Sequence, residues 1–181
     1  FNLVGNPYPS PVDWDLVDAL NTNIDNAVYY FSNSDADQYG GSYITYINGI
    51  SSDGRATNII PSMQGFFIHV TDGEFPVEGS LVMNNSVRVN DLTHPFIKSA
   101  EAEQPKLLRL SACFSTSPEA PDYTVIYFDE QATPEFDGQF DALKLLNTDT
   151  NVPSLFSVTP GATRLSINGM PPPGGKTLLV P

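Results

Sequence analysis

Gln64-Gly65-Phe66-Phe67-Ile68-His69-Val70-Thr71 is the stretch that decides the fold class of this chain. Successive side chains of a β-strand point to opposite faces, so Phe66, Ile68 and Val70 share one apolar face. We expect that face to be buried in a core. The opposite face is mixed and includes His69, which we therefore predict to be a hydrogen-bonded residue at the rim of the core rather than a metal ligand.

Runs of the same kind recur along the whole chain. Sixteen Pro and thirteen Gly divide the sequence into short pieces, and the pieces between them are rich in Val, Ile, Tyr, Phe and Thr, which favour strands. Besides residues 64–71, strands are predicted at 1–4, 27–32, 42–48, 80–84, 106–114, 123–128, 142–146, 155–158, 163–168 and 177–180. This spacing is typical of an all-β sandwich or barrel rather than of alternating strands and helices.

One short helix is expected. Trp14, Val17 and Leu20 recur at helical spacing, and Asp13 is placed to cap the first turn. Asn48-Gly49 has the composition of a tight hairpin turn.

The polar and acidic stretch before Pro105 lacks any apolar period and resembles a linker. We therefore predict two consecutive antiparallel β-sandwich units of jelly-roll or immunoglobulin-like type. The first unit covers residues 1–97, the linker covers 98–105, and the second unit covers 106–181. The sequence leaves open whether the second unit is a complete sandwich.

The charge balance excludes some classes of partner. Eight basic residues against 21 acidic residues give a formal net charge of −13, and the basic residues are scattered along the chain. Binding to nucleic acid or to an anionic membrane surface requires clustered positive charge. No apolar run approaches the length that spans a bilayer. We therefore expect neither nucleic-acid binding nor membrane insertion.

The sequence offers no clear reaction centre, and we predict no catalytic residue, metal or cofactor. His69 and His94 do not have paired metal-ligand spacing. Segments 35–40 and 147–151 partly resemble calcium loops but lack required positions, so polar surface loops are the simpler interpretation. The carboxylates between Asp129 and Asp141 are interpreted as a solvated acidic hairpin, with a hydrolase as the alternative. Cys113 is predicted to be a buried or half-buried, unreactive thiol.

Three aromatic residues are the candidate binding residues. Trp14, at the proline-rich corner, and Tyr29 and Tyr30, on a predicted strand, are aromatic side chains able to form a surface on which sugar rings stack. The alternative is that they belong to the core, because about half of the aromatic residues of such strands face inward.

Several segments resemble, in the same order, a known kind of sequence. Residues 2–14 (NLVGNPYPSPVDW), 60–67 (IPSMQGFF), 85–88 (NSVR) and 165–171 (LSINGMP), together with the acidic hairpin at 122–145, carry the likeness. They resemble the β-sandwich region found next to the C-terminal type IX secretion sorting domain in secreted and surface proteins of Bacteroidetes. The resemblance implies a secreted or outer-cell-surface protein. We expect this chain to be a fragment of such a longer protein, cut at both termini.

The function that follows is a non-catalytic, structural or adhesin-like module next to an export sorting domain. The alternative is a carbohydrate-binding module of a surface protein that processes glycans. A surface glycan or another surface protein is the expected partner, and the residues do not indicate an oligomeric state.

Overall fold

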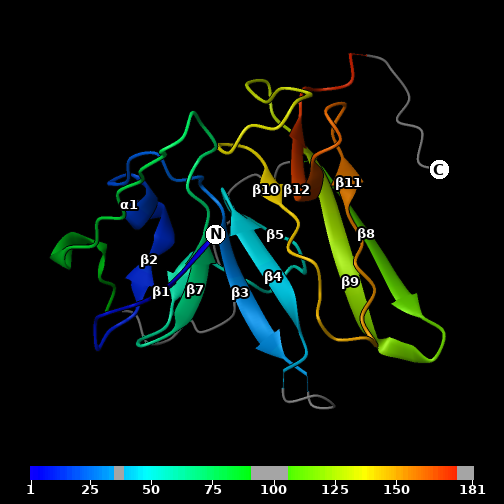
Figure 1. The fold of residues 1–181 in the computed structure, drawn as a ribbon, viewed down its shortest axis with the longest axis horizontal. Helices are drawn as coiled ribbons and strands as arrows, with labels where there is room; N and C mark the ends of the chain where they lie inside the picture. The colour runs from blue at the N-terminus through cyan, green and yellow to red at the C-terminus, as the bar shows by residue number, and fades with distance from the viewer. Residues whose placement is uncertain (35–38, 91–105, 175–181) are drawn as a thin grey trace.

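The structure is a computed structural model that describes residues 1–34, 39–90 and 106–174. The fold is all-β and has three layers lying side by side (Figure 1). A layer with one short helix lies against a first sheet, and a second sheet lies on the other side. Within the described part of the chain the helical elements are α1 (Trp14–Asp18) and the 3-10 turn η1 (Asn85–Val87). The linker predicted at 98–105 and the strand predicted at 177–180 lie outside the described residues.

The first sheet has five antiparallel strands in the order β1-β7-β3-β4-β5. Their bounds are β1 Asn2–Gly5, β3 Val28–Asn33, β4 Gly41–Ile47, β5 Ile50–Ser51 and β7 Gly65–Ile68. The β4–β5 hairpin turns at Asn48 and Gly49, whose φ angles of 48° and 81° are the positive values that a two-residue hairpin requires. The predicted Asn-Gly turn is thus confirmed.

The second sheet follows the order β10-β12-β9-β8, and β11 also pairs with β12. Its strands are β8 Leu107–Phe114, β9 Ser117–Phe128, β10 Ala142–Leu143, β11 Ser157–Val158 and β12 Arg164–Met170. The pairing of β9 with β12 is parallel, so the expectation of wholly antiparallel units is corrected at this pair. Residues 129–163 between these strands provide the long crossover that a parallel pair needs.

A first core lies between the first sheet and the helical layer. That layer contains α1, η1 and a two-stranded sheet of β2 (Val12–Asp13) and β6 (Ile59–Ile60). The fully or almost fully buried side chains of this core are Val12, Trp14, Val17, Val28, Tyr46, Ile60, Phe66, Ile68 and Val87. The predicted inward face of residues 66 and 68 is therefore confirmed.

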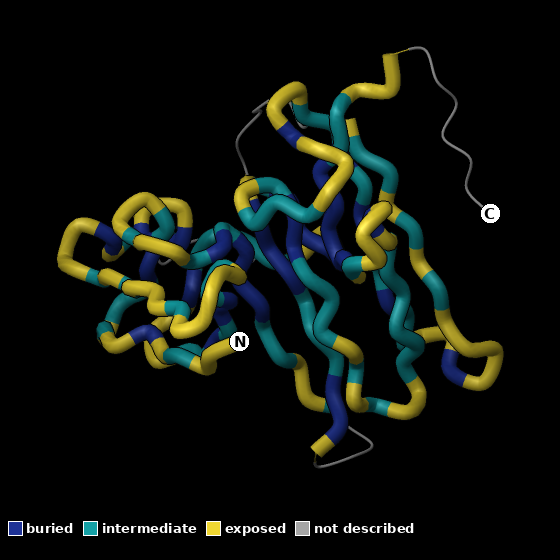
Figure 2. Tube along the Cα trace, turned by 45° about the horizontal axis from the view of Figure 1, so that its top comes forward, coloured by how far each residue is buried: buried dark blue, intermediate teal, exposed yellow. Residues whose placement is uncertain are grey.

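A second core lies between the two sheets. Tyr29 and Ile47 of the first sheet meet Val125, Tyr127 and Ile167 of the second sheet in one buried cluster. Both faces of the first sheet are consequently covered over much of their area. In Figure 2 the buried segments run through the middle of the strands, while the exposed ones follow the outer loops. Whether the two predicted units fold separately stays a prediction.

The first corner of the chain is held by the side chain of Asn6, which is 2% exposed. Its amide nitrogen donates to the carbonyls of Ser10 and Pro61, both at 2.9 Å, and its oxygen accepts from the backbone of Tyr8 at 2.9 Å. The proline-rich turn is thereby tied to the segment between β6 and β7.

Several predicted elements are shorter in the structure or absent from it. The strand predicted at 64–71 covers only Gly65–Ile68, and the one predicted at 142–146 covers only Ala142–Leu143. The helix ends at Asp18 rather than at Leu20, although Asp13 caps it as expected. The strand predicted at 80–84 is reduced to a single bridge between Ser80 and Thr22. After Ser80, backbone N–H groups pair with side chains instead of with a neighbouring strand. The side-chain oxygen of Asn21 accepts from Val82 N, and that of Asn84 accepts from Ser86 N.

Candidate functional site

Two of the three predicted binding aromatics are buried. Trp14 is 1% exposed, and its indole N–H donates to the carbonyl of Asn26 at 2.7 Å. Tyr29 is 0% exposed, and its hydroxyl accepts from the backbone N–H of Leu143 at 3.0 Å. A sugar ring needs an exposed aromatic face, so a stacking role fits neither residue. For Tyr29 strand alternation does not reveal the burial, because both faces of the first sheet are covered.

Tyr30 alone of the three borders a pocket. The pocket has a volume of about 330 Å³ and lies where β3 and β4 meet the segment 53–64. Its lining includes Tyr30, Ile44, Asp53, Arg55, Thr57 and Gln64. Aromatic and aliphatic walls with a few convergent polar groups are typical of small-ligand sites, and this pocket is the candidate functional site.

The loop after β5 places the charged groups of the pocket. Asp53 Oδ1 accepts hydrogen bonds from Ser51 Oγ at 2.7 Å and from Arg55 N at 2.8 Å, while Gly54 has a φ of 82°. Asp53 Oδ2 accepts from Arg55 Nε at 2.7 Å. Burial raises the pKa of Asp53, but the hydrogen bonds from Arg55, Ser51 and Ala56 outweigh it and hold the pKa below its ordinary value. Asp53 is therefore a carboxylate at neutral pH.

The second sheet supports this loop from behind. Arg109 of β8 donates from Nε to the carbonyl of Ser52 at 3.1 Å and from Nη2 to the carbonyl of Ser51 at 3.0 Å. A Cβ atom on Gly54 would lie 3.4 Å from the Arg109 guanidinium, an ordinary contact distance, so the φ of 82° rather than lack of space favours glycine here. The sequence carried no signal for a contact between this loop and residue 109.

Tyr30 contributes its ring and a weakly held hydroxyl. The hydroxyl donates to the carbonyl of Thr57 at 3.4 Å. Burial, and to a lesser degree the nearby charge of Asp15, raises the pKa of Tyr30 well above its ordinary value. The hydroxyl therefore stays protonated and acts as a hydrogen-bond donor at physiological pH.

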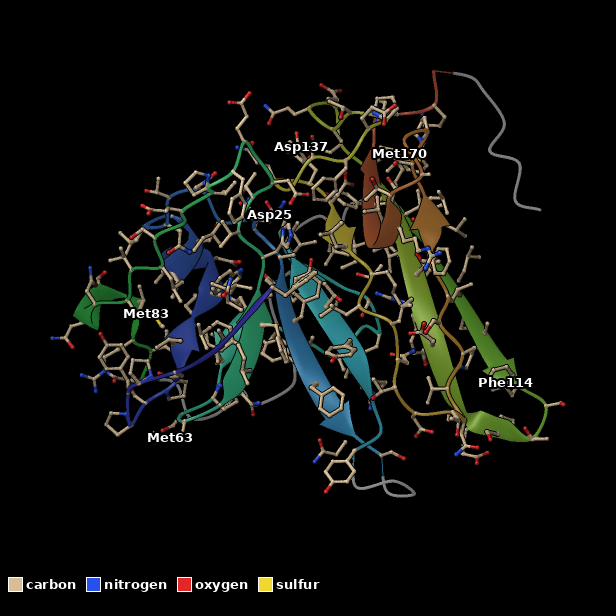
Figure 3. The ribbon with its side chains drawn as sticks, in the orientation of Figure 1. Asp25, Met63, Met83, Phe114, Asp137 and Met170 are labelled. Atoms are coloured by element: carbon tan, nitrogen blue, oxygen red, sulfur yellow. The ribbon has the colours of Figure 1, made fainter. Side chains whose placement is uncertain are left out.

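A second polar cluster lies at the junction of the first sheet with the loop 137–141. Asp25 Oδ2 lies 2.7 Å from His69 Nδ1, and Asp25 Oδ1 accepts from Thr71 Oγ1 at 2.7 Å. Figure 3 labels Asp25 beside Asp137 in this region. The other ring nitrogen of His69 lies 3.8 Å from Asp72 Oδ1. An Asp–His pair that activates a nucleophile presents a hydroxyl or thiol at that position, whereas here a carboxylate occupies it. His69 is thus hydrogen-bonded at the rim, as predicted.

The acidic segment 129–141 is built around Asp141, which is 1% exposed. Its carboxylate accepts hydrogen bonds from Gly169 N and Asp137 N, both at 2.8 Å. Burial raises the pKa of Asp141 to about 6, although the two backbone hydrogen bonds lower it. The carboxylate of Glu135 likewise accepts from Gly161 N at 3.1 Å. These groups hold loops together, and the hydrolase alternative stays an untested hypothesis.

The calcium alternatives have little support in the described residues. Residues 35–38 of the first segment are not described. In the second segment, Asn147 Oδ1 accepts from Tyr43 N at 3.0 Å and Thr148 Oγ1 accepts from Gly41 N at 3.1 Å, so both side chains attach this segment to β4. Across ranges 1–34, 39–90 and 106–174, no group of three or more His, Cys, Asp or Glu is arranged to hold a metal ion.

The prediction for Cys113 is wrong, because its side chain is exposed. It lies near the end of β8, where the register with β9 shifts between Ala112 and Phe114. A register shift changes which side chains face the core, and the alternation of the sequence does not show it.

The fold and the pocket together define a three-layer all-β protein with a small, mainly apolar pocket that carries a few polar groups beside its central sheet. The chain belongs to the family described as Domain of unknown function (DUF8693), which matches residues 1–181. No curated protein and no solved structure matches the chain. Among the described residues, no helix has the length and apolarity needed to cross a membrane.

Proposed function

We propose that this chain is a non-catalytic β-sandwich module of a secreted or cell-surface protein, with a structural or adhesin-like role next to an export sorting domain. The observation that carries the proposal is the use of polar side chains as ties between layers. Arg109 of the second sheet donates to Ser51 and Ser52 of the first, and the hydroxyl of Tyr29 accepts from Leu143. Such ties make a rigid body.

The sequence resemblance supports the location in the cell. The segments at 2–14 and 60–67 form the first corner and the start of β7, which Asn6 joins. These segments therefore have a structural role, which is what we expect of a non-catalytic module. A glycan or another protein of the cell surface is the partner that the proposal implies.

The gene that encodes this chain provides the direct test. We expect its reading frame to continue into a C-terminal sorting domain, and we expect protease treatment of intact cells to remove the protein from the surface. A reading frame without any export signal, or a protein found only inside the cells, contradicts the proposal.

Carbohydrate binding is the second candidate function, and the pocket beside Tyr30 favours it. An aromatic ring, a guanidinium and a carboxamide surround one hollow, which suits the apolar faces and hydroxyls of a sugar. A glycan array tests it with the wild type and Tyr30→Ala. Saturable binding that the substitution abolishes, while the melting temperature stays close to that of the wild type, supports this function. Binding that the substitution does not change excludes the pocket as the site, and an array without any binding contradicts the function.

A further inference from the structure

Arg55 lines the pocket and carries a partly unpaired guanidinium. Its side chain is 77% exposed, and the hydrogen bond to Asp53 engages only Nε. Among the described residues, Nη1 and Nη2 have no hydrogen-bond partner. The outer edge of a guanidinium carries donors in a planar fork that matches the two oxygens of a carboxylate.

Asp53 holds this guanidinium in place without competing for the outer edge. Its side chain is 3% exposed, and Oδ1 already accepts three hydrogen bonds, from Ser51 Oγ, Arg55 N and Ala56 N. Oδ2 binds Nε, on the inner side of the fork. The Asp53–Arg55 pair is therefore neutral overall and carries its unused donors on one side.

The other residues of the pocket suit a ligand that has both hydroxyl groups and apolar faces. Ser32 Oγ and Gln64 Oε1 have no hydrogen-bond partner among the described residues, whereas Gln64 Nε2 donates to Gly65 O at 2.7 Å. Tyr30 and Ile44 add the apolar wall. A pyranose ring has both apolar faces and hydroxyls around its edge.

We propose that the pocket binds an acidic saccharide, with the carboxylate of a uronic acid unit on Arg55 and the sugar ring against Tyr30. The proposal rests on the second candidate function and specifies its ligand. A neutral hydroxyl group leaves part of the guanidinium fork unused, whereas a carboxylate engages it with two charge-assisted hydrogen bonds. The net charge of −13 weakly opposes the approach of an anion, because exposed charges beyond about 10 Å are screened at 0.1 M salt.

Isothermal titration of the whole 181-residue chain tests the proposal with three probes. The probes are tri-galacturonate, its neutral methyl ester, and hexanoate as a carboxylate without a sugar ring. We expect saturable binding of tri-galacturonate and binding at least about tenfold weaker for the ester and for hexanoate, which corresponds to about 1.4 kcal/mol. Arg55→Gln should weaken tri-galacturonate binding to a similar extent.

Arg164→Gln is the matched control variant, since it removes the same charge from an exposed arginine of β12 on the second sheet. We expect it to bind tri-galacturonate like the wild type. Arg55→Lys keeps the charge without the fork and should bind more weakly than the wild type. Melting temperatures of all variants establish that each is folded.

The outcomes separate this inference from the function on which it rests. Equal binding of the acid and its ester, lost in Tyr30→Ala but not in Arg55→Gln, overturns the inference and leaves carbohydrate binding standing. Hexanoate binding as tight as tri-galacturonate also overturns it. Binding of none of the three probes overturns the inference, and an empty glycan array in addition removes the second candidate function.

Discussion

Lys144 Nζ lies 2.5 Å from Asp122 Oδ2 inside the second sheet, and the two side chains are 2% and 6% exposed. The same carboxylate oxygen accepts from the backbone N–H of Leu155 at 2.6 Å. Burial lowers the pKa of Lys144, and its hydrogen bond and charge interaction with Asp122 only partly offset this. The pair therefore joins β9 to the segments after β10 and before β11.

Lys144→Met should strongly destabilise the fold. It leaves the Asp122 carboxylate buried without a counter-charge, which typically costs about 3–5 kcal/mol. Urea unfolding followed by circular dichroism measures the change. Lys106→Met, at an exposed lysine, is the matched control and should be nearly neutral. The double variant Lys144→Met/Asp122→Leu should recover much of the loss, and a single variant as stable as the control contradicts the prediction.

Arg109→Met should destabilise the loop after β5 that lines the pocket, although residue 109 lies on the second sheet. The carbonyls of Ser51 and Ser52 lose their donors, at a cost of about 1–3 kcal/mol. We expect faster amide hydrogen exchange in the loop that carries Asp53, measured by mass spectrometry. Arg164→Met provides the control. Unchanged exchange at residues 51–56 in the Arg109 variant means that the clamp does not support the loop.

Asp141 should give the stability a pH dependence of defined sign. Its pKa in the folded state, about 6, lies above the ordinary carboxyl value of 3.8, so the folded state binds the proton more tightly. The contribution is fully present below pH 3.8 and is lost as the pH rises through about 6.

Asp141→Asn isolates this contribution. The amide cannot accept from both backbone N–H groups, so we expect the variant to be less stable than the wild type at every pH. We also expect the fall in stability that Asp141 causes between pH 4 and 6 to be lost. The measurement is the urea midpoint at a series of pH values. Glu130→Gln, at an exposed carboxylate, is the control and should keep the wild-type slope. An Asp141→Asn profile parallel to the wild type contradicts the assignment.

Trp14→Ala should destabilise the protein by about 3–5 kcal/mol, because it removes the largest side chain of the first core. The ring packs edge-on against Phe66 with a centroid distance of 5.8 Å. Trp14 is the sole tryptophan, so its fluorescence reports this core directly. We expect emission that shifts to longer wavelength on unfolding and is poorly quenched by iodide in the native state. Strong quenching in the native state indicates an accessible ring and contradicts its burial.

Much of the secondary structure could be predicted from local pattern. The alternation of Phe66 and Ile68, the Asn48-Gly49 turn and the cap at Asp13 depend on neighbouring residues alone, and all three are present, although the strand is shorter than the predicted 64–71. Short strands such as β5 and β6 were missed, since two residues are too few for a period to appear. The strand expected at 80–84 failed because side chains from elsewhere supply its partners.

The candidate site was much less predictable. Trp14, Tyr29 and Tyr30 look alike in the sequence, yet only Tyr30 borders the pocket. Which face of a strand is covered depends on what packs on it. In this protein the second sheet covers Tyr29, and the first sheet covers Trp14, which belongs to the helical layer.

The sequence by itself determined the all-β class, the acidic surface charge and the positions of the main turns, because these depend on composition and on residues close together along the chain. The tertiary structure decided which aromatics are buried, that residue 109 supports the loop at 51–55, and that Lys144 meets Asp122. Those contacts join residues between 22 and 58 positions apart. The packing of the two sheets brings residue 109 to the loop at 51–55, and the pairing of strands within the second sheet brings Lys144 to Asp122. No local preference encodes either contact.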